Sequence, residues 1–577
     1  MARVRKVEIQ NFRGIKELTW FPKPGMNCLI GPGDSGKSTI LDAIDLCLGA
    51  RRNLQLGDAD FHQLDTDSPI VIALTLGDLD DELKSMDAYG LFLRAFDPHT
   101  RDMADEPKLG AETVLSLQLS VGNDLEPAWT LVSERAQAQS VTRNLSWAER
   151  VRLAPTRIGT GVEQNLSWRR GSVLNLLSEE SPDVSAALLK AAREARSSFG
   201  ESAEEQLRNV LEQVSKIATD LGIPVGEKAR ALLDAHSVSF SGGTISLHDE
   251  DGVPLRGLGA GSSRLLVAGL QRVAAEKSPI ILIDELEHGL EPHRIIRLLG
   301  SLGAKDDPSP LQVFVTTHSP TALRELKGSQ LFIVRDTTHC HEVIEVGDGD
   351  DAQSTIRLSP EAFLAPSVIV CEGASEVGFL RGMDHHRTAQ GETSIGAHGV
   401  ALVDAGGGEA DRVYYRADTF LRLGYRTAVL RDNDKKPSAE LEQAFKEAGG
   451  VVICWRDDRA LEDELFLSSS VVCVSNLIDR AAELHGENLI NAHIMSSSGN
   501  GTGLKQIREE LLGKAISDKN REFLGRASRI RRSGWFKSVT WMEGVARDIV
   551  APNLDESDDA FQNLIRGIFE WSTGGPS

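Results

Sequence analysis

The chain has 577 residues, of which 41% are hydrophobic and 26% charged, and its formal net charge is -22. This length exceeds what one hydrophobic core organises and predicts about two to four domains. The acidic balance repels polyanions, so contact with nucleic acid would need a local basic surface or metal ions. Six scattered cysteines without zinc spacing favour a reduced, cytoplasmic protein, and the absence of a long apolar run predicts no membrane segment.

Strand patterns dominate the first part of the chain. Residues 3–10 alternate between apolar and polar side chains, and residues 18–21 can pair with them as a hairpin across 11–14. This hairpin would bring Arg13 close to the segment that begins at Gly31. Further strands are expected at 70–76, 114–121 and 129–132, with a polar surface excursion over 97–110. We therefore expect an antiparallel layer beside the segment that begins at Gly31.

The segment 31–39, Gly-Pro-Gly-Asp-Ser-Gly-Lys-Ser-Thr, lies between an apolar run at 26–30 and a predicted helix over 40–48. Glycines in such a loop let backbone N–H groups converge on phosphate oxygens. Lys37 supplies a cation, and Ser38 supplies a hydroxyl for Mg²⁺. The segment therefore predicts a phosphate-binding loop for ATP. Its expected nucleotide contacts are Gly31, Gly33, Asp34, Ser35, Gly36, Lys37, Ser38 and Thr39, with Arg13 close by.

A change to helical periodicity marks residues 174–235, which we expect to form a helical insertion that serves dimerisation. Strands are predicted again at 237–240 and 244–247. The segment 258–264, Leu-Gly-Ala-Gly-Ser-Ser-Arg, then opens a helix that runs to about residue 276. A glycine-rich turn at the start of a helix is a candidate anion site.

Two buried strands that end in polar residues follow. The strand at 279–283 ends in Asp284 and Glu285, where Asp284 would hold the Mg²⁺ bound by Ser38 and Glu285 would orient or deprotonate the attacking water. The strand at 311–316 leads to His318, which is expected beside the γ-phosphate. We therefore predict Glu285 and His318 as catalytic residues.

The phosphate loop, the 258–264 turn, the acid pair, the Gly289–Pro292 loop and His318 together resemble an ABC-type ATPase of the RecF/SMC/Rad50 kind. The resemblance implies that the turn acts in trans, with Gly259, Gly261 and Ser262 closing on ATP held by a partner subunit. The insertion carries no sustained heptads, which disfavours a chromosome-tethering SMC role. Gln55 is the candidate for the glutamine on the magnesium side.

Acidic residues follow the predicted strands of the second half. The strand at 366–371 leads into Glu372, that at 400–403 into Asp404, and that at 426–430 into Asp432 and Asp434. A further strand at 451–455 precedes Glu462 and Asp463. Strands alternating with helices predict a parallel sheet whose acidic strand ends share one edge. Carboxylates gathered in this way repel one another unless divalent cations lie between them.

This layout resembles a Toprim domain, the metal-binding fold of topoisomerases, primases and certain nucleases. An ABC-type ATPase followed by Toprim is similar to the OLD (overcoming lysogenization defect) family nucleases, whose members include the nuclease subunit of Gabija antiphage systems. The resemblance implies two divalent metals, Mg²⁺ or Mn²⁺, and a phosphate-side lysine, Lys537. The implied metal ligands are Glu372, Asp432 and Asp434 for one ion, with Glu376 and Asp463 helping to hold a second.

A basic cluster stands out in this acidic chain and predicts contact with the DNA backbone; a solvated helix face is the less favoured alternative for its arginines. Its members are Arg526, Arg529, Arg531, Arg532 and Lys537. A topoisomerase needs a tyrosine nucleophile in a second catalytic domain, and a primase needs a template-binding module. Neither is recognisable, so a nuclease is favoured.

The predicted fold is α/β, an ABC-type ATPase domain with a helical dimerisation insertion followed by a Toprim parallel-sheet domain. The predicted bounds are 1–173 and 236–362 for the two parts of the ATPase, 174–235 for the insertion and 363–577 for Toprim. The predicted function is a DNA endonuclease that needs divalent metal and is gated by ATP, in antiphage defence or DNA processing. The alternative is an ATP-gated DNA-binding or repair protein without nuclease activity. The expected partners are DNA and further copies of the chain, in a homodimer or a tetramer; a helicase encoded nearby is a candidate partner.

Overall fold

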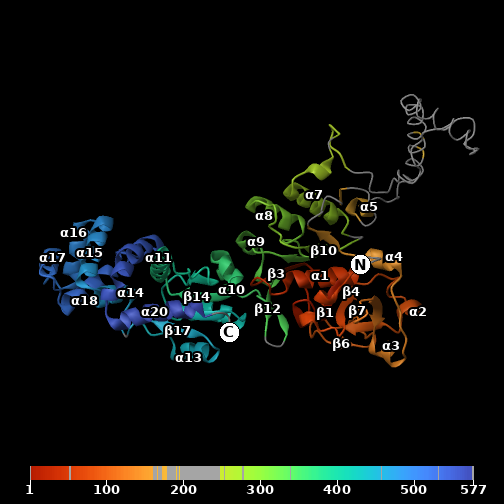
Figure 1. Ribbon diagram of the computed structural model, residues 1–577, viewed down its shortest axis with the longest axis horizontal. Coiled ribbons are helices and arrows are strands. Elements are labelled where there is room, and N and C mark those ends of the chain that lie inside the picture. Colours follow the sequence, from red (N-terminus) through yellow and green to blue (C-terminus); the bar gives the residue numbers. More distant parts are fainter. Residues whose placement is uncertain are drawn as a thin grey trace, which may run out of the picture. The chain divides into compact units, whose positions relative to one another are not determined.

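The computed structural model divides the chain into two compact units (Figure 1), one formed by Met1–Leu29, Gly36–Glu325 and Thr337–His341, the other by Ile30–Ser35, Leu326–Asp336 and Glu342–Ser577. The residues that the structure describes are 2–50, 54–159, 165–166, 172–177, 190, 194, 247–252, 254–275, 278–337, 340–456, 458–530 and 532–574. Most of the predicted insertion at 174–235 lies outside these residues. So do the predicted strands at 237–240 and 244–247, apart from residue 247.

The N-terminal hairpin is confirmed. Strand β1 (Arg3–Phe12) pairs antiparallel with β2 (Ile15–Trp20), and Ile9 lies opposite Leu18. The inward-facing positions of β1 are fully buried, as the alternating pattern requires. Leu18, Ile9 and their neighbours thus form one apolar face of the sheet.

The antiparallel layer continues through strands that pair in the order β1-β4-β7-β5-β6, with β8 also paired to β7. These strands are β4 (Ile70–Gly77), β5 (Leu93–Phe96), β6 (Met103–Ala104), β7 (Glu112–Val121) and β8 (Pro127–Val132). The strands predicted at 70–76, 114–121 and 129–132 are confirmed. Strand β5 was missed, and β6 lies inside the segment that was expected to be a surface excursion.

A parallel portion carries the phosphate loop. Strands β3 (Met26–Ile30), β11 (Gln312–Thr316), β10 (Ile280–Ile283) and β9 (Thr156–Ile158) lie in that order. Every residue of β3, β10 and β11 is buried, which explains their continuous apolar character. Helix α1 (Lys37–Leu48) packs on this sheet against β1, β4, β10 and β11. The parallel strands therefore deliver their C-terminal ends to one edge.

The remaining helices of the first unit are short or lie beside β10. Helix α7 (Ala260–Val273) contacts α5 (Val173–Leu177) and α8 (Pro292–Ser301), and α8 contacts α9 (Pro320–Glu325). The others are α2 (Met86–Tyr89), α3 (Glu134–Ala138) and α4 (Trp147–Leu153). The helix predicted from the 258–264 turn is confirmed, with its end three residues earlier than expected.

The second unit contains a four-stranded, all-parallel sheet in the order β15-β14-β16-β17. Its strands are β14 (Ser367–Cys371), β15 (Val400–Asp404), β16 (Arg426–Arg431) and β17 (Val451–Cys454), each where the sequence predicts a strand. Helices α11 (Ala374–Ala389), α12 (Arg412–Arg422) and α13 (Ala439–Glu447) connect them in turn. Strands β12 (Leu331–Asp336) and β13 (His341–Glu345) and helix α10 (Asp350–Leu358) precede this sheet in the chain and were not predicted.

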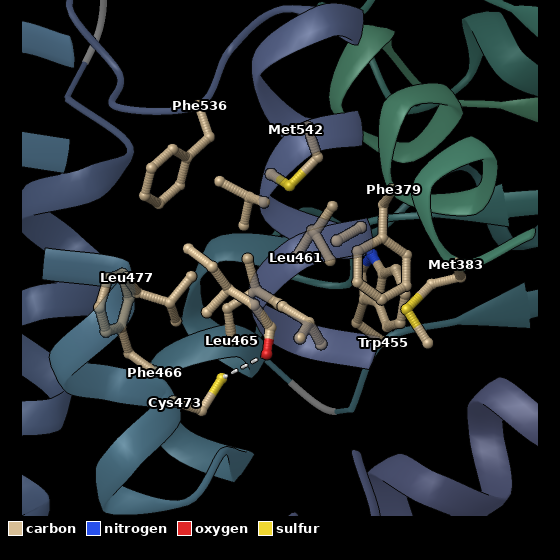
Figure 2. Close-up of a cluster of buried hydrophobic side chains, with 14 of the residues drawn as sticks. Phe379, Met383, Trp455, Leu461, Leu465, Phe466, Cys473, Leu477, Phe536 and Met542 are labelled. Atoms are coloured by element: carbon tan, nitrogen blue, oxygen red, sulfur yellow. Dashed lines mark hydrogen bonds between the residues drawn. The ribbon is translucent and has the colours of Figure 1, made fainter. Parts of the chain in front are cut away.

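Helices make up the chain after β17, and their side chains complete the core of the second unit (Figure 2). They are α14 (Leu461–Ser468), α15 (Val471–His485), α16 (Glu487–Ser497), α17 (Leu504–Leu512), α18 (Asp518–Ser528), α19 (Val539–Val545) and α20 (Asp559–Thr573). Phe379 of α11 and Trp455 meet edge to face with ring centroids 5.7 Å apart, and Leu461, Leu465 and Met542 belong to the same buried cluster. Among the described helices, none combines the length and apolar character that crossing a membrane requires.

Two glycines let α11 pack closely against α19 and the residues that follow it. A Cβ atom at Gly378 would lie 2.4 Å from the carbonyl oxygen of Val539, and one at Gly382 would lie 2.3 Å from that of Glu543. Real Cβ atoms do not approach a backbone oxygen so closely. The helix that follows Glu372 is therefore fixed to the helix that follows Lys537.

We expect Gly378→Ala to destabilise the second unit by about 1–3 kcal/mol, because α19 must move away from the added methyl group. Gly567→Ala is the matched control: Gly567 lies in α20 with open space around its Cβ position, and alanine there should stabilise the helix by up to about 1 kcal/mol. Chemical denaturation monitored by circular dichroism measures both. Equal stability of the Gly378→Ala variant and the wild type would contradict this account of the α11–α19 contact.

Candidate functional site

The segment between β3 and α1 has the backbone of a phosphate-binding loop. Gly31, Asp34 and Gly36 have φ angles of 134°, 58° and 87°, in the region that favours glycine. Ser35 Oγ donates to the carbonyl of Pro32 at 2.9 Å, which closes the loop. Lys37 is buried at the start of α1, whereas Gly33, Asp34 and Ser38 are exposed to an incoming ligand. The bend and the helix N-terminus suit a bound phosphate.

A hydroxyl and a carboxylate predicted to share Mg²⁺ lie together. Ser38 Oγ donates to Asp284 Oδ1 at 3.0 Å, and Thr316 Oγ1 donates to the same oxygen at 2.6 Å. Thr316 Oγ1 also accepts from the backbone N–H of Glu285 at 2.9 Å. These oxygen atoms are of the kind that Mg²⁺ prefers. The residues present therefore fit a nucleotide-bound magnesium ion, and Thr316 is a partner that the sequence analysis missed.

The two predicted catalytic residues of this unit are exposed and their backbones are held in place. Glu285 has a φ of 48°, and its carboxylate lies 3.8 Å from His288 Nδ1. The backbone N–H of His318 donates to Glu287 Oε1 at 2.8 Å, and Thr317 Oγ1 donates to Glu287 Oε2 at 2.6 Å. Glu287 thus caps the loop after β11. The sequence signal for this contact is the acid at 287, two residues beyond Glu285. Its partner Thr317 lies 30 residues later in the chain, so no local pattern links the two.

Arg13 is held by two carboxylates. It donates to Asp42 at 2.5 Å, on the second turn of α1, and to Asp60 at 2.9 Å. Arg157, which the sequence analysis missed, pairs with Asp42 at 2.7 Å and approaches Asp284 Oδ2 at 3.9 Å. Both arginines therefore contact Asp42 of α1, and Arg157 also lies close to Asp284. Gln55, the candidate for the magnesium-side glutamine, is exposed.

The glycine-rich turn at the start of α7 is exposed at its tip. Gly259 is the N-cap of α7, and Leu258, Gly259 and Ala260 are accessible to solvent. Ser262 Oγ accepts from Arg294 at 3.1 Å. The predicted residues Gly259, Gly261 and Ser262 thus occupy the first turn of a helix with its tip free to meet another molecule.

In the second unit, the predicted acidic residues gather at the C-terminal edge of the parallel sheet. Glu372 Oε2 accepts from the backbone N–H of Asp432 at 2.9 Å, and Asp432 Oδ1 accepts from that of Leu461 at 2.9 Å. Glu376 and Asp463 each cap their own helix, accepting from Gly373 N and Ala460 N. Strands β14 and β16 and the N-termini of α11 and α14 therefore bring these carboxylates together.

Burial and mutual repulsion shift the acidity of this cluster. Burial raises the pKa of Asp432, and the nearby carboxylates of Glu462 and Glu372 raise it further. The pKa of Glu376 is raised in the same way, by burial first and then by Asp432 and Glu462. Burial also raises the pKa of Glu372. Each carboxylate is therefore costly to ionise without a compensating positive charge.

Glu462 is the member of the acid pair at 462–463 that faces the cluster. Its side chain is 2% exposed, and its Oε1 has no hydrogen-bond partner. Burial raises the pKa of Glu462, while the charges of Lys537 and Arg529 lower it. Its neighbour Asp463, the predicted ligand, also pairs with Arg529 at 3.3 Å.

Arg529, predicted to contact the DNA backbone, lies against the acidic cluster in this structure. Its guanidinium lies 2.7 Å from Asp434 Oδ2, so two predicted metal ligands share one arginine. Arg526 pairs with Glu522 at 3.4 Å, and Arg532 is exposed. Arg531 lies outside the described residues.

Lys537 is exposed at the end of a fixed loop. Trp535 and Phe536, just before it, are buried. Trp535 donates from Nε1 to His493 Nδ1 at 3.1 Å, and its carbonyl lies 2.8 Å from His485 Nε2. The lysine therefore projects from a segment that both histidines hold.

The donor set of the second unit fits a divalent cation in its chemistry. It consists of buried carboxylates, the ligands that hard cations prefer, and it includes the unpartnered Glu462 Oε1. Across the described part of the chain, however, no three or more His, Cys, Asp or Glu side chains are already arranged as a metal site. In this arrangement backbone N–H groups and Arg529 occupy several of the carboxylate oxygens.

Comparison with known proteins identifies a family for this chain. Residues 26–324, more than half of the chain, match the family described as "AAA domain, putative AbiEii toxin, Type IV TA system". Two curated relatives are each a DNA replication and repair protein RecF. That of Prosthecochloris aestuarii is 47% identical over 45 residues, 8% of this chain and 12% of the relative. That of Desulforamulus reducens is 43% identical over 42 residues, which are 7% of this chain and 11% of the relative. The chain thus spans about an eighth of either relative.

Solved structures of Smc heads are also similar to this chain. An SmcHead bound to the C-winged helix domain of ScpA is 16% identical, covering 59% of this chain and 96% of its own, with a TM-score of 0.34. The Smc head of Pyrococcus furiosus, with an extended coiled coil, is 13% identical, covering 60% and 96%, with a TM-score of 0.32. The SMC head of Thermotoga maritima is 15% identical, covering 60% of this chain and 99% of its own, with a TM-score of 0.28. These scores carry no conclusion about function.

We expect the metal-free second unit to lose stability as pH rises from about 4 toward 8, because carboxylates with raised pKa values bind more protons in the folded state than in the unfolded one. The stability that these protonated carboxyl groups contribute is complete below the ordinary carboxylate pKa. It is lost as pH rises through the raised pKa values of Asp432 and Glu376. Asp432→Asn should therefore raise the melting temperature in chelator at about pH 8 and have a smaller effect at about pH 5.

Glu442→Gln is the control with the opposite sign. Burial raises the pKa of Glu442. Hydrogen bonds from Lys446, Tyr414 and Arg431 outweigh this effect and hold that pKa at about 2. This substitution should lower the melting temperature at neutral pH. An Asp432→Asn variant that melts below the wild type at about pH 8 in chelator would contradict the described charge crowding.

Proposed function

This chain belongs to the AAA-domain family that its residues 26–324 match, and from that premise we propose that it is an ATP-hydrolysing DNA endonuclease that needs divalent metal. ATP binding and hydrolysis at the first unit would gate cutting by the second. The observation that carries the nuclease proposal is the cluster of buried carboxylates at one edge of the parallel sheet, with Glu462 Oε1 unpartnered. Buried acids without cations are costly, so a function that supplies cations explains them.

An ABC-type reaction is supported by the residues around Asp284. Lys37 would neutralise the β- and γ-phosphates, and Ser38 and Asp284 would hold Mg²⁺. Glu285, whose backbone is held by Thr316, would orient or deprotonate the attacking water. His318 would contact the γ-phosphate from the loop that Glu287 caps.

A Toprim-like nuclease is supported by the strand order β15-β14-β16-β17 and by the acids that follow β14 and β16. Glu372, Asp432 and Asp434 would hold one metal, and Glu376 with Glu462 or Asp463 a second. Bound by these residues, two divalent ions would supply an activated water and stabilisation of the leaving 3′ oxygen. Lys537 would neutralise the phosphoryl oxygens in the transition state, from a loop that His485 and His493 hold in place.

A dimer is part of the proposal, because the tip of the 258–260 turn is exposed and can meet another subunit. An ABC-type turn acts on ATP held by a second copy of the chain. DNA is the proposed substrate, and the RecF relatives carry names in DNA replication and repair.

The second candidate is an ATP-gated DNA-binding protein without nuclease activity. One observation favours it: in the described residues, no group of three ligands is already arranged for a metal. Supercoiled plasmid incubated with the protein and Mg²⁺ or Mn²⁺ separates the two functions. DNA binding without nicking in either metal would support this candidate.

We expect Glu285→Gln to abolish steady-state ATP hydrolysis while retaining ATP binding, because the amide keeps the size of the side chain but cannot accept a proton from water. Release of phosphate measures hydrolysis, and calorimetry with Mg²⁺–ATP measures binding. His288→Gln, which alters only the imidazole 3.8 Å from Glu285, is the control and should retain most of the rate. Wild-type hydrolysis by Glu285→Gln would remove this residue from the mechanism.

We expect Asp432→Ala to abolish metal-dependent cutting while sparing ATP hydrolysis, because it removes a proposed ligand from the second unit alone. Plasmid nicking and phosphate release measure the two activities side by side. Asp411→Ala is the control: Asp411 lies in the same unit, accepts from Ser438 N at 2.7 Å and is not a proposed metal ligand.

Lys37→Ala tests the division of labour between the units. It should change regulation or assembly more than the cleavage chemistry, because Lys37 belongs to the proposed nucleotide site and not to the acidic cluster. A folded, dimeric Lys37→Ala protein that fails to cut under conditions where the wild type cuts without ATP would show that the nucleotide site takes part in cleavage itself.

A further inference from the structure

Arg264 is a buried arginine whose role the proposed ATPase mechanism does not include. It lies on the second turn of α7, and its side chain is 2% exposed. Its guanidinium donates to five backbone carbonyl oxygens, and four of them belong to the loop that follows β10. The acceptors are Asp284 at 3.0 Å, Glu285 at 3.1 Å, Leu286 at 3.3 Å, His288 at 2.8 Å and Ile158 at 3.5 Å.

Removing a guanidinium from water costs free energy, so contacts that only arginine makes must offset that cost. Its planar fork reaches carbonyls on several sides at once, which the single ammonium of lysine cannot do. Burial lowers the pKa of Arg264, while the charges of Glu287, Glu285 and Asp284 raise it. The side chain therefore favours one conformation of the loop, the one in which these carbonyls point inward.

The same helix turn contacts this loop at one further point, and it also contacts the helix that follows the loop. A Cβ atom at Gly261 would lie 2.7 Å from the carbonyl oxygen of Gly289, so the two backbones are in direct contact. Ser262 Oγ accepts from Arg294, at the start of α8. The exposed 258–260 tip and the loop that carries Asp284 and Glu285 thus form one connected element.

We propose that Arg264 is a positioning residue that couples the 258–262 turn to the Asp284–His288 loop, so that ATP binding at one subunit alters the nucleotide site of the next. This inference rests on the proposed dimeric ATPase, in which the turn contacts ATP held by the partner subunit. When that ATP draws the turn, Arg264 moves the backbone of Glu285 in its own site. Because such coupling is reciprocal, the two sites bind ATP cooperatively.

The test is an equilibrium ATP-binding isotherm of the full chain with Mg²⁺, measured by calorimetry, for the wild type and for Arg264→Lys. The wild type should bind with a Hill coefficient above one, and Arg264→Lys should bind with a coefficient of one. The hydrolysis rate of the variant should fall by up to roughly a hundredfold, because a displaced Glu285 is misaligned with its water. The melting temperature shows whether the variant is folded.

Two further variants sharpen the result. Gly261→Ala keeps the buried cation but forces the turn away from Gly289, and it should also lose cooperativity. Arg272→Lys is the matched control, because Arg272 lies on the same helix, is partly exposed and pairs with Asp306 at 2.7 Å. It should bind ATP as the wild type does.

Non-cooperative binding by the wild type, or wild-type cooperativity retained in Arg264→Lys and Gly261→Ala, overturns the inference. Hydrolysis is a separate readout of the proposed function. A wild type that binds ATP cooperatively but does not hydrolyse it contradicts the ATPase and leaves the coupling supported. A wild type that hydrolyses ATP without cooperativity contradicts the coupling alone.

Discussion

Parallel strand pairing is the constraint on which both candidate sites depend. In a parallel sheet every strand ends at the same edge, so residues far apart in the chain meet there. Cys371 lies opposite Leu430 in the register of β14 and β16, which places Glu372 against the backbone of Asp432, 60 residues later. In the first unit, Ile283 lies opposite Val315, and Asp284 therefore meets Thr316. A shift of one residue in either pairing would separate these groups.

The same constraint creates an electrostatic problem that the helices only partly solve. The N-terminus of α14 donates to Asp432 and Asp463, which stabilises negative charge there. Arg529 supplies one full positive charge to Asp434 and Asp463. Glu376 and Glu462 receive less compensating positive charge, and burial keeps their pKa values raised. The residual negative charge is what a bound cation would neutralise.

Elements with a clear period were predictable from the sequence, and partnerships across the fold were not. The alternation in β1 and the continuous apolar runs of β10, β11 and β14 placed those strands correctly. The short strands β5, β6 and β9 carry too few residues to show a period. Helices α14 to α20 were not resolved individually, since helical patterns there follow one another without a strong break.

Three consecutive acids show why the site was only partly predictable. Burial raises the pKa of Glu464, but hydrogen bonds from Arg456 and Ser468 lower it overall, so this residue is a structural ion pair. Asp463 caps α14, and Glu462 faces the cluster with an unpartnered oxygen. The side chains are chemically alike and adjacent in sequence. Their roles differ only through arginines and helix ends that the fold brings to them, which no local pattern records.

The close packing of α11 on α19 has a consequence for how the protein is made. Glu372 immediately precedes α11, and Lys537 immediately precedes α19, so the glycine contact at Gly378 joins the two chemical ends of the proposed nuclease site. Some 165 residues must be synthesised between them. During translation the acidic edge therefore exists without its lysine until α19 has left the ribosome and docked. A nascent chain would hold an incomplete site, so the proposed nuclease activity would arise only after α19 has docked.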